Sequence, residues 1–149
     1  YGHGLVFFSS GFDRPTFYAV KPTGRGDVTD THIAWSITKG APHTPSPLLV
    51  GNELYLFSDG GIGSCLDAGT GEVHWRERVC GSCSASPFFA AGRIHIIDET
   101  GKGVVIEAGK TYRKLAENDI NERTLASCAV GENAFYLRGA THLYKIQHR

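Results

Sequence analysis

Ser46-Pro47-Leu48-Leu49-Val50 begins a pattern that returns at Ser86-Pro87-Phe88-Phe89-Ala90, 40 positions further along the chain. The pattern returns once more at Ser127-Cys128-Ala129-Val130-Gly131, after another 41 positions. A fixed period of this length is typical of stacked supersecondary units. The sequence therefore predicts a repeat protein, and its function has to be argued from a site rather than from the scaffold.

Each repeat contains four short apolar runs separated by turn residues. In the second copy, these runs cover residues 47–50, 53–58, 63–67 and 72–79. They are rich in Val, Ile, Leu, Phe and Tyr, which favours β-strands. The best helix candidate, residues 112–118, aligns with a strand of the preceding copy, so we expect a strand there as well.

Four antiparallel strands in about 40 residues make one propeller blade. The predicted fold class is all-β: a β-propeller fragment of about three and a half four-stranded blades in an incomplete ring. We expect one partial propeller domain over residues 1–149, with blades at approximately 1–45, 46–85, 86–126 and 127–149. The first copy lacks its innermost strand and the last copy lacks its outermost strand. Because closed propellers typically have about 4–8 blades, we expect either the C-terminal part of a larger propeller or two copies that pair into one ring.

Composition excludes several classes of function. The chain has 149 residues, with 15 Lys and Arg against 15 Asp and Glu, so its formal net charge is +0. This balance argues against binding to nucleic acid or anionic membranes through bulk charge. No apolar run approaches the roughly 20 residues of a membrane span. We expect no nucleic-acid partner and no membrane span.

The most specific motif is Asp67-Ala68-Gly69-Thr70-Gly71-Glu72-Val73-His74-Trp75. Asp67 and Thr70 can bond backbone amides across a turn, and Gly71 can take a left-handed conformation. The motif resembles the tryptophan-docking repeat of pyrroloquinoline quinone (PQQ) propeller proteins. This resemblance implies a structural blade-docking role for Asp67, Thr70, Gly71 and Trp75, in which the tryptophan stacks on the neighbouring blade.

The resemblance to bacterial PQQ-like β-propeller repeat proteins covers nearly the whole chain. The chain is similar to the C-terminal part of such proteins. Residues 2–6, 12–15, 24–35, 40–47 and 135–146 also look like segments of these proteins. Two copies depart from the docking motif. The first has Lys21-Pro22-Thr23-Gly24, and the third has Glu107, Lys110 and Leu115 in place of Asp, Thr and Trp. The family resemblance implies an extracytoplasmic location, in the periplasm or cell envelope.

Two functions follow from this resemblance. The first is a non-catalytic scaffold that binds a protein, peptide or saccharide without a cofactor, and whose ring is closed by further blades or by a second copy. Because loops carry binding residues, we expect partner contacts from Arg25, Asp27 and Asp30 in the long insert of the first blade, and from residues 39–43. The alternative is a fragment of a PQQ-dependent (quinoprotein) alcohol or sugar dehydrogenase, which would bind PQQ with calcium.

The residues that could carry chemistry do not form a recognisable reaction centre. Calcium needs about 6–8 oxygen ligands, and the sequence shows no compact cluster of carboxylates. No Gly-x-Ser-x-Gly elbow supports a hydrolase. We therefore expect no catalytic and no metal-binding residues, we name no cofactor-binding residue, and we favour a protein that is not an enzyme.

Cys80-Gly81-Ser82-Cys83 is a C-x-x-C motif in a loop between two predicted blades. Such a pair can be half of a zinc site or a redox pair, but no second pair of ligands follows at suitable spacing. We expect these cysteines to be free or bridged to each other. Cys65 and Cys128 lie on predicted strands, where cysteine usually behaves as a small buried apolar group.

Overall fold

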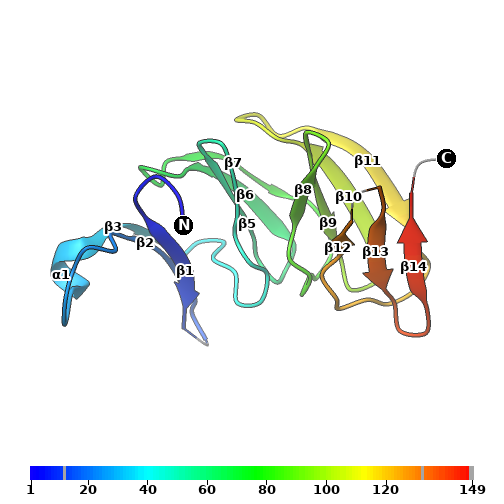
Figure 1. Ribbon diagram of the computed structural model, residues 1–149, viewed down its shortest axis with the longest axis horizontal. Coiled ribbons are helices and arrows are strands. Elements are labelled where there is room, and N and C mark those ends of the chain that lie inside the picture. Colours follow the sequence, from blue (N-terminus) through cyan, green and yellow to red (C-terminus); the bar gives the residue numbers. More distant parts are fainter. Residues whose placement is uncertain (12, 132, 148–149) are drawn as a thin grey trace.

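The computed structural model describes residues 1–11, 13–131 and 133–147, which form four antiparallel sheets (Figure 1). Glu132, in a predicted hairpin, lies outside these residues. The first sheet contains β1 (Val6–Ser10), β2 (Thr16–Val20) and β3 (Ile33–Ile37). The second contains β4 (Leu48–Val50), β5 (Glu53–Phe57), β6 (Ile62–Asp67) and β7 (Val73–Arg78). The third contains β8 (Phe88–Ala90), β9 (Arg93–Ile97), β10 (Lys102–Glu107) and β11 (Lys114–Asp119). The fourth contains β12 (Ala129–Val130), β13 (Phe135–Arg138) and β14 (Leu143–Ile146).

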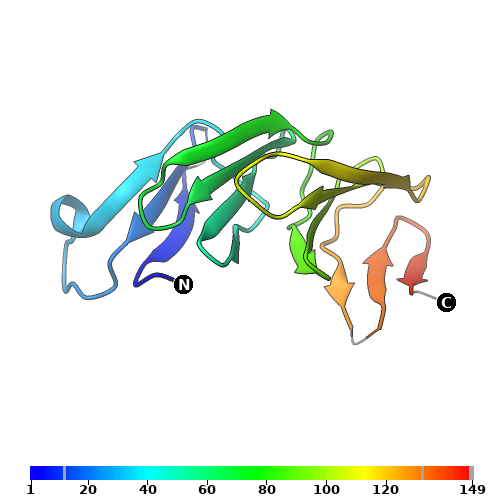
Figure 2. The ribbon, with the colours of Figure 1, turned by 90° about the horizontal axis from the view of Figure 1, so that it is seen from above.

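The sheets follow one another in chain order along an open arc (Figure 2). In each sheet the strands also pair in chain order, as up-and-down neighbours. The predicted all-β fold of a partial propeller is therefore confirmed. Residues 112–118, the best helix candidate, lie largely in strand β11, as expected.

One short helix was not expected from the sequence. Helix α1 (Thr29–His32) is a single turn inside the insert between β2 and β3. The Asp27 carboxylate accepts a hydrogen bond from the Thr29 backbone N–H at 3.0 Å, just before this turn. Four residues are too few to show the apolar spacing by which helices are recognised in a sequence.

Two apolar clusters lie between neighbouring sheets. Phe17, Leu54, Leu56 and Leu66 belong to the cluster that joins the first and second sheets. The cluster between the second and third sheets is larger, and its buried members are Tyr55, Phe57, Cys65, Trp75, Val79, Cys83, Ile94, Ile96, Val104 and Ile106. The first three sheets therefore bury apolar side chains against one another, as stacked repeats do.

The serines that open the repeats link the sheets near the start of their first strands. Ser46 N–H donates to Ser86 Oγ at 3.0 Å, and Ser86 N–H donates to Ser127 Oγ at 2.9 Å. Each hydroxyl thus accepts from the backbone of the preceding repeat. Serines one repeat apart in the sequence are therefore joined by a row of hydrogen bonds that runs across the sheets.

A bulge also repeats where the third and fourth strands pair. Cys65 pairs with Trp75 just before the bulge in the second sheet, and Val105 pairs with Ala116 at the matching place in the third sheet. An ungapped alignment of the repeats pairs Trp75 with Leu115. The strand register shows that this pairing is wrong, because the residue that matches Trp75 is Ala116. Leu115 is the extra residue of the bulge, because the turn before β11 is one residue longer.

Candidate binding groove

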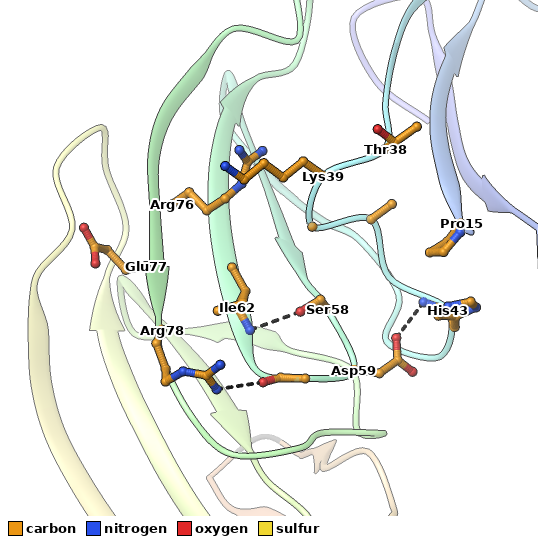
Figure 3. A pocket seen from close by; sticks show the side chains of 13 residues that line it. Pro15, Thr38, Lys39, His43, Ser58, Asp59, Ile62, Arg76, Glu77 and Arg78 are labelled. Atoms are coloured by element: carbon orange, nitrogen blue, oxygen red, sulfur yellow. Dashed lines mark hydrogen bonds between the residues drawn. The ribbon is translucent and has the colours of Figure 1, made fainter. Parts of the chain in front are cut away.

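A groove of about 530 Å³ opens between the first two sheets (Figure 3). One wall comes from the segment between β3 and β4, which supplies Lys39 and His43. The other wall comes from β7, which supplies Arg76 and Arg78, and the floor comes from the β5–β6 turn. The groove is lined by Pro15, Thr38, Lys39, Gly40, Ala41, His43, Ser58, Asp59, Gly60, Ile62, Arg76, Glu77 and Arg78.

Strand periodicity separates the charges on β7. Arg76 and Arg78 are two positions apart, so they lie on the same face of the strand, whereas Glu77 points to the opposite face (Figure 3). Gly40, the residue after Lys39, lies against Arg76, because a Cβ on Gly40 would be 3.3 Å from Arg76 Nε. The groove face therefore gathers three cationic side chains, two from β7 and one from the β3–β4 connection.

Both arginines are held in place by contacts at the edge of the groove. Arg76 Nε–H donates to Ser64 Oγ at 3.1 Å, and Ser64 is fully buried. Arg78 Nη1–H donates to the Gly60 carbonyl at 3.0 Å. Each contact uses a single N–H group. The remaining donors of these guanidinium groups can bind a ligand, because a guanidinium has five N–H donors.

Asp59, the carboxylate on this face of the groove, is already engaged. It accepts from the backbone N–H of His43 at 2.7 Å and of Thr44 at 3.1 Å. Burial alone would raise the pKa of Asp59, but the bonds from Thr44 and His43 hold it below its usual value. The ionised Asp59 thus fixes the loop that carries Lys39, while Lys39 and Arg78 are exposed and Arg76 is half-buried.

Fixed guanidinium and ammonium groups bind anionic oxygens. Arginine offers paired N–H donors that match a carboxylate or phosphate, and charge-assisted bonds of this kind are about twice as strong as neutral ones. This arrangement can bind an anionic group. The described residues that line the groove include no paired nucleophile and base that would make it a reaction centre.

The predicted docking residues form the β6–β7 turn and the strand that follows it. Asp67 Oδ1 accepts from Gly69 N–H at 3.0 Å, from Thr70 N–H at 2.9 Å and from Thr70 Oγ1–H at 3.0 Å. The backbone bond from Thr70 is the largest cause that lowers the pKa of Asp67. Gly71 has a φ of 76°, so it adopts the left-handed conformation that its place in the motif predicts.

The motif serves two different contacts between sheets. Trp75 points to the third sheet, where its Nε1–H donates to the Gly109 carbonyl at 3.0 Å and its ring lies 5.2 Å from that of Tyr112. The Asp67–Gly71 turn instead receives Trp35 from the first sheet. Trp35 Nε1–H donates to the Ala68 carbonyl at 3.1 Å, and a Cβ on Gly71 would lie 2.6 Å from the Trp35 ring.

Trp35 is a docking residue that the motif alone does not reveal. The first copy departs from the docking motif before this position, so the local pattern assigns Trp35 no role. The signal is nevertheless present, because Trp35 and Trp75 are separated by the same 40 positions as the repeats. The period therefore locates the docking tryptophan even where the local motif is degenerate.

The predicted contact residues of the insert lie away from the groove. Arg25, Asp27 and Asp30 are exposed in the segment that leaves β2 and enters β3. This segment lies at the Val20–Ile33 end of that strand pair, whereas Pro15 and Thr38 of the groove flank the opposite end. The structure thus does not bring the three residues to the groove, and their role as contacts stays a prediction.

Two observations concern the PQQ and calcium of the alternative function. Within residues 1–11, 13–131 and 133–147, no group of three or more His, Cys, Asp or Glu could hold a metal ion. Trp75, at 8% exposure, and Trp35 both pack between sheets, so neither ring is free to stack on a quinone. The absence of a cofactor stays a prediction.

Comparisons with known proteins identify the fold. No protein-family profile and no curated protein matches the chain. BamB from Moraxella catarrhalis is similar in structure, with a TM-score of 0.76 and 12% identity over 97% of this chain and 43% of that chain. A quinohemoprotein alcohol dehydrogenase from Pseudomonas putida HK5 gives a TM-score of 0.68 and 13% identity, over 90% of this chain and 26% of that one. AztD from Citrobacter koseri gives 0.60 and 19% identity, over 84% of this chain and 35% of that one.

These similarities define the class of protein. The chain has the fold of the PQQ-like β-propellers, and the resemblance predicted from its sequence is confirmed at the level of the fold. The chain spans less than half the length of each of these proteins. Among the residues that the structure describes, no helix has the length and apolar character needed to cross a membrane.

Proposed function

We propose that this chain is part of a non-catalytic propeller scaffold that binds a protein or peptide partner in the groove between its first two sheets. The groove takes a segment that carries carboxylates. The observation that carries this proposal is the meeting of Lys39, Arg76 and Arg78 on one face, where Asp59 is already bonded to backbone. The similarity to BamB supports a propeller scaffold in general terms.

Charge chemistry favours an acidic peptide over a neutral saccharide. Cationic side chains increase the rate of encounter with anionic segments and fix their orientation. Because the whole chain is neutral, this attraction is a property of the groove and not of the bulk charge. An extracytoplasmic location belongs to the same proposal and rests on family resemblance.

The direct test is fluorescence anisotropy with a labelled hexaglutamate peptide. We expect saturable binding that weakens with added salt, and no comparable binding of a neutral oligosaccharide. The double substitution Lys39→Gln with Arg78→Gln should weaken binding roughly 5- to 30-fold, at about 0.5–1 kcal/mol for each exposed charge.

The matched control is Arg93→Gln with Lys110→Gln, which removes the same charge from exposed positions on β9 and in the β10–β11 connection. This control should bind like the unmodified chain. Equal binding by both double variants would contradict the proposal that the peptide binds in the groove. Tighter binding of the oligosaccharide than of the peptide would show that the ligand is a saccharide and not an acidic peptide.

The insert remains a second proposed contact region. Replacing Arg25, Asp27 and Asp30 together should leave hexaglutamate binding unchanged, because these residues lie at the other end of the strand pair. The same triple replacement should weaken capture of a physiological partner that contacts both the groove and the insert. Unchanged capture would remove the insert from the binding surface.

The quinoprotein dehydrogenase fragment remains the alternative, motivated by the docking motif and by the fold shared with an alcohol dehydrogenase. Titration of the chain with PQQ and calcium, followed by absorbance, tests whether this part contributes to a cofactor site. We expect no saturable binding, since the described residues form no oxygen cluster for calcium.

A further inference from the structure

The C-x-x-C loop packs directly behind the groove. Residues 79–83 lie between β7 and β8, and they cover the β5–β6 turn at residues 58–61. The front of the same turn lines the groove through Ser58, Asp59 and Gly60. The cysteine loop and the groove thus share one structural element.

Backbone hydrogen bonds hold the loop on this turn at both ends of the motif. Val79 N–H and Cys80 N–H donate to the Gly61 carbonyl at 3.0 and 3.3 Å. Cys83 N–H donates to the Asp59 carbonyl at 2.9 Å. Both cysteines are therefore held against the same short turn, which fixes their separation.

The approach of loop and turn is close enough to require glycine. Gly61 has a φ of 81°, and a Cβ at this position would collide with the carbonyl oxygens of Cys80 and Gly81. On the other side, Gly81 N–H donates to Asp98 Oδ2 at 3.1 Å. The loop is thus clamped between the turn and the third sheet.

Cys80 packs against the buried cluster that contains Cys83, and both residues belong to this clamped loop. A hydrogen bond between them lowers the pKa of Cys83 and raises that of Cys80. Cys83 is fully buried and donates its thiol to the Ser58 carbonyl at 3.3 Å. Cys80 is partly exposed and lines a second cavity of about 350 Å³, so a small reagent can reach it.

We propose that Cys80 and Cys83 form a reversible disulfide that fastens the loop onto the Ser58–Gly61 turn. A small-molecule disulfide supplies the oxidant. Access makes Cys80 the first nucleophile: it loses its proton to solvent, and its sulfur attacks one sulfur of the reagent and releases the first thiol. Cys83 then loses its proton and attacks Cys80 in the mixed disulfide, which releases the second thiol. The two protein thiols lose two protons and two electrons, which the reagent takes up as two free thiols.

The other two cysteines provide the contrast. Cys65 is fully buried on β6, and burial raises the pKa of its thiol to about 11. Cys128 lies just before β12 and is partly exposed, which differs from the buried strand position predicted from the sequence. Burial also raises the pKa of Cys128. Neither of these two cysteines shares a loop with another cysteine, so both should remain reduced when the loop pair is oxidised.

The test uses the full chain in buffers of reduced and oxidised glutathione, followed by alkylation, proteolysis and mass spectrometry. In oxidising buffer we expect one peptide linkage, between Cys80 and Cys83, and alkylation of Cys65 and Cys128 only. The double variant Cys80→Ser with Cys83→Ser should form no internal disulfide, and Cys65→Ala with Cys128→Ala should form it normally. Four alkylated cysteines in oxidised wild type, or a linkage between other cysteines, would overturn the proposal.

A second measurement does not depend on any variant folding. Hydrogen exchange of the Val79, Cys80 and Cys83 amides should slow on oxidation of the wild-type chain, because the bridge opposes local opening of the loop. The melting temperature should rise by about 5 °C, as expected for a short closed loop in a chain of this size. Exchange and melting unchanged between the two forms would show that the bridge does not fasten the loop, and would overturn that part of the proposal.

Discussion

The contact between the second and third sheets is built differently from the contact between the third and fourth. The first of these has Trp75, which is 8% exposed and donates to the next sheet, within a cluster of buried side chains. The second has Ala116 at the matching register position, and a cavity of about 380 Å³ lies beside Phe88, His95 and Phe135. Repeats of one period can therefore form contacts of unequal quality, depending on the residue that faces the next sheet.

Polar contacts replace the tryptophan where the fourth sheet joins the third. Glu122, in the connection after β11, accepts from Thr141 Oγ1–H at 2.6 Å and from Tyr144 O–H at 2.5 Å. Thr124 Oγ1–H donates to the Arg138 carbonyl at 2.7 Å. The fourth sheet is thus held by hydrogen bonds at one edge and by Phe135, whose ring lies 5.0 Å from that of Phe88, without a docking tryptophan. We expect it to be the less stable contact.

The largest effect is expected from Trp75→Ala, which removes a buried ring and its bond to Gly109. The free energy of unfolding should fall by about 3–5 kcal/mol, as measured by urea denaturation. The control is Leu115→Ala, at a residue that is 38% exposed in the bulge, and it should cost about 1 kcal/mol or less. If both variants lost the same free energy of unfolding, Trp75 would not make the contact between the second and third sheets stronger than the contact between the third and fourth.

A smaller loss is expected from Gly71→Ala, because its Cβ would meet the Trp35 ring and its φ is positive. We expect a cost of about 2–3 kcal/mol, combining backbone strain with overpacking. Gly92→Ala is the matched control, since Gly92 has a φ of 75° but no atom within 4 Å of the place that its Cβ would take. It should cost about 1 kcal/mol, and thermal melts of the two variants separate the clash from the strain.

The serine links should have a more modest effect that compares the two contacts directly. Ser86→Ala removes the acceptor for Ser46 N–H, and Ser127→Ala removes the acceptor for Ser86 N–H. Each should cost about 0.5–1.5 kcal/mol in urea denaturation. Ser46→Ala is the control, because its hydroxyl takes part in neither link. A control loss as large as the other two would show that the links do not stabilise the arc.

The smallest effect concerns the pH dependence of the fourth sheet. Hydrogen bonds from Thr141 and Tyr144 lower the pKa of Glu122 to about 2. Since the folded pKa is lowered, the stabilisation is present above the ordinary value of about 4.5 and is lost as the pH falls toward 2. Glu122→Gln should therefore melt earlier than wild type at pH 7, and the difference should shrink by pH 3. A difference that is constant with pH would contradict the role of the ionised carboxylate.

Much of the fold could be predicted because the repeats obey local rules. The runs 53–58 and 63–67 correspond to β5 and β6 within one residue at each end, since alternating apolar residues and turn glycines mark strands directly. The position of Ala116 could not be predicted, because one extra residue in a turn shifts the register without changing the apolar pattern.

Less of the candidate groove could be predicted. Residues 39–43 were expected to contact a partner as a loop, and the structure places Lys39 and His43 in the groove wall. Arg76 and Arg78 had no signal of their own, because alternating charges on an exposed strand look like an ordinary solvated face. Their meeting with Lys39 depends on how two sheets pack, and strand periodicity does not encode the angle between sheets.

The sequence by itself determined the strands, their turns and the stacking of repeats, because these depend on side-chain alternation and on residues only a few positions apart. It also located Trp35, once the period rather than the local motif is followed. Only the tertiary structure decided that three cations share a groove and that the Cys80–Cys83 loop lies behind it. Those features join residues from separate sheets or connections, and their distances are set by packing between elements rather than by spacing along the chain.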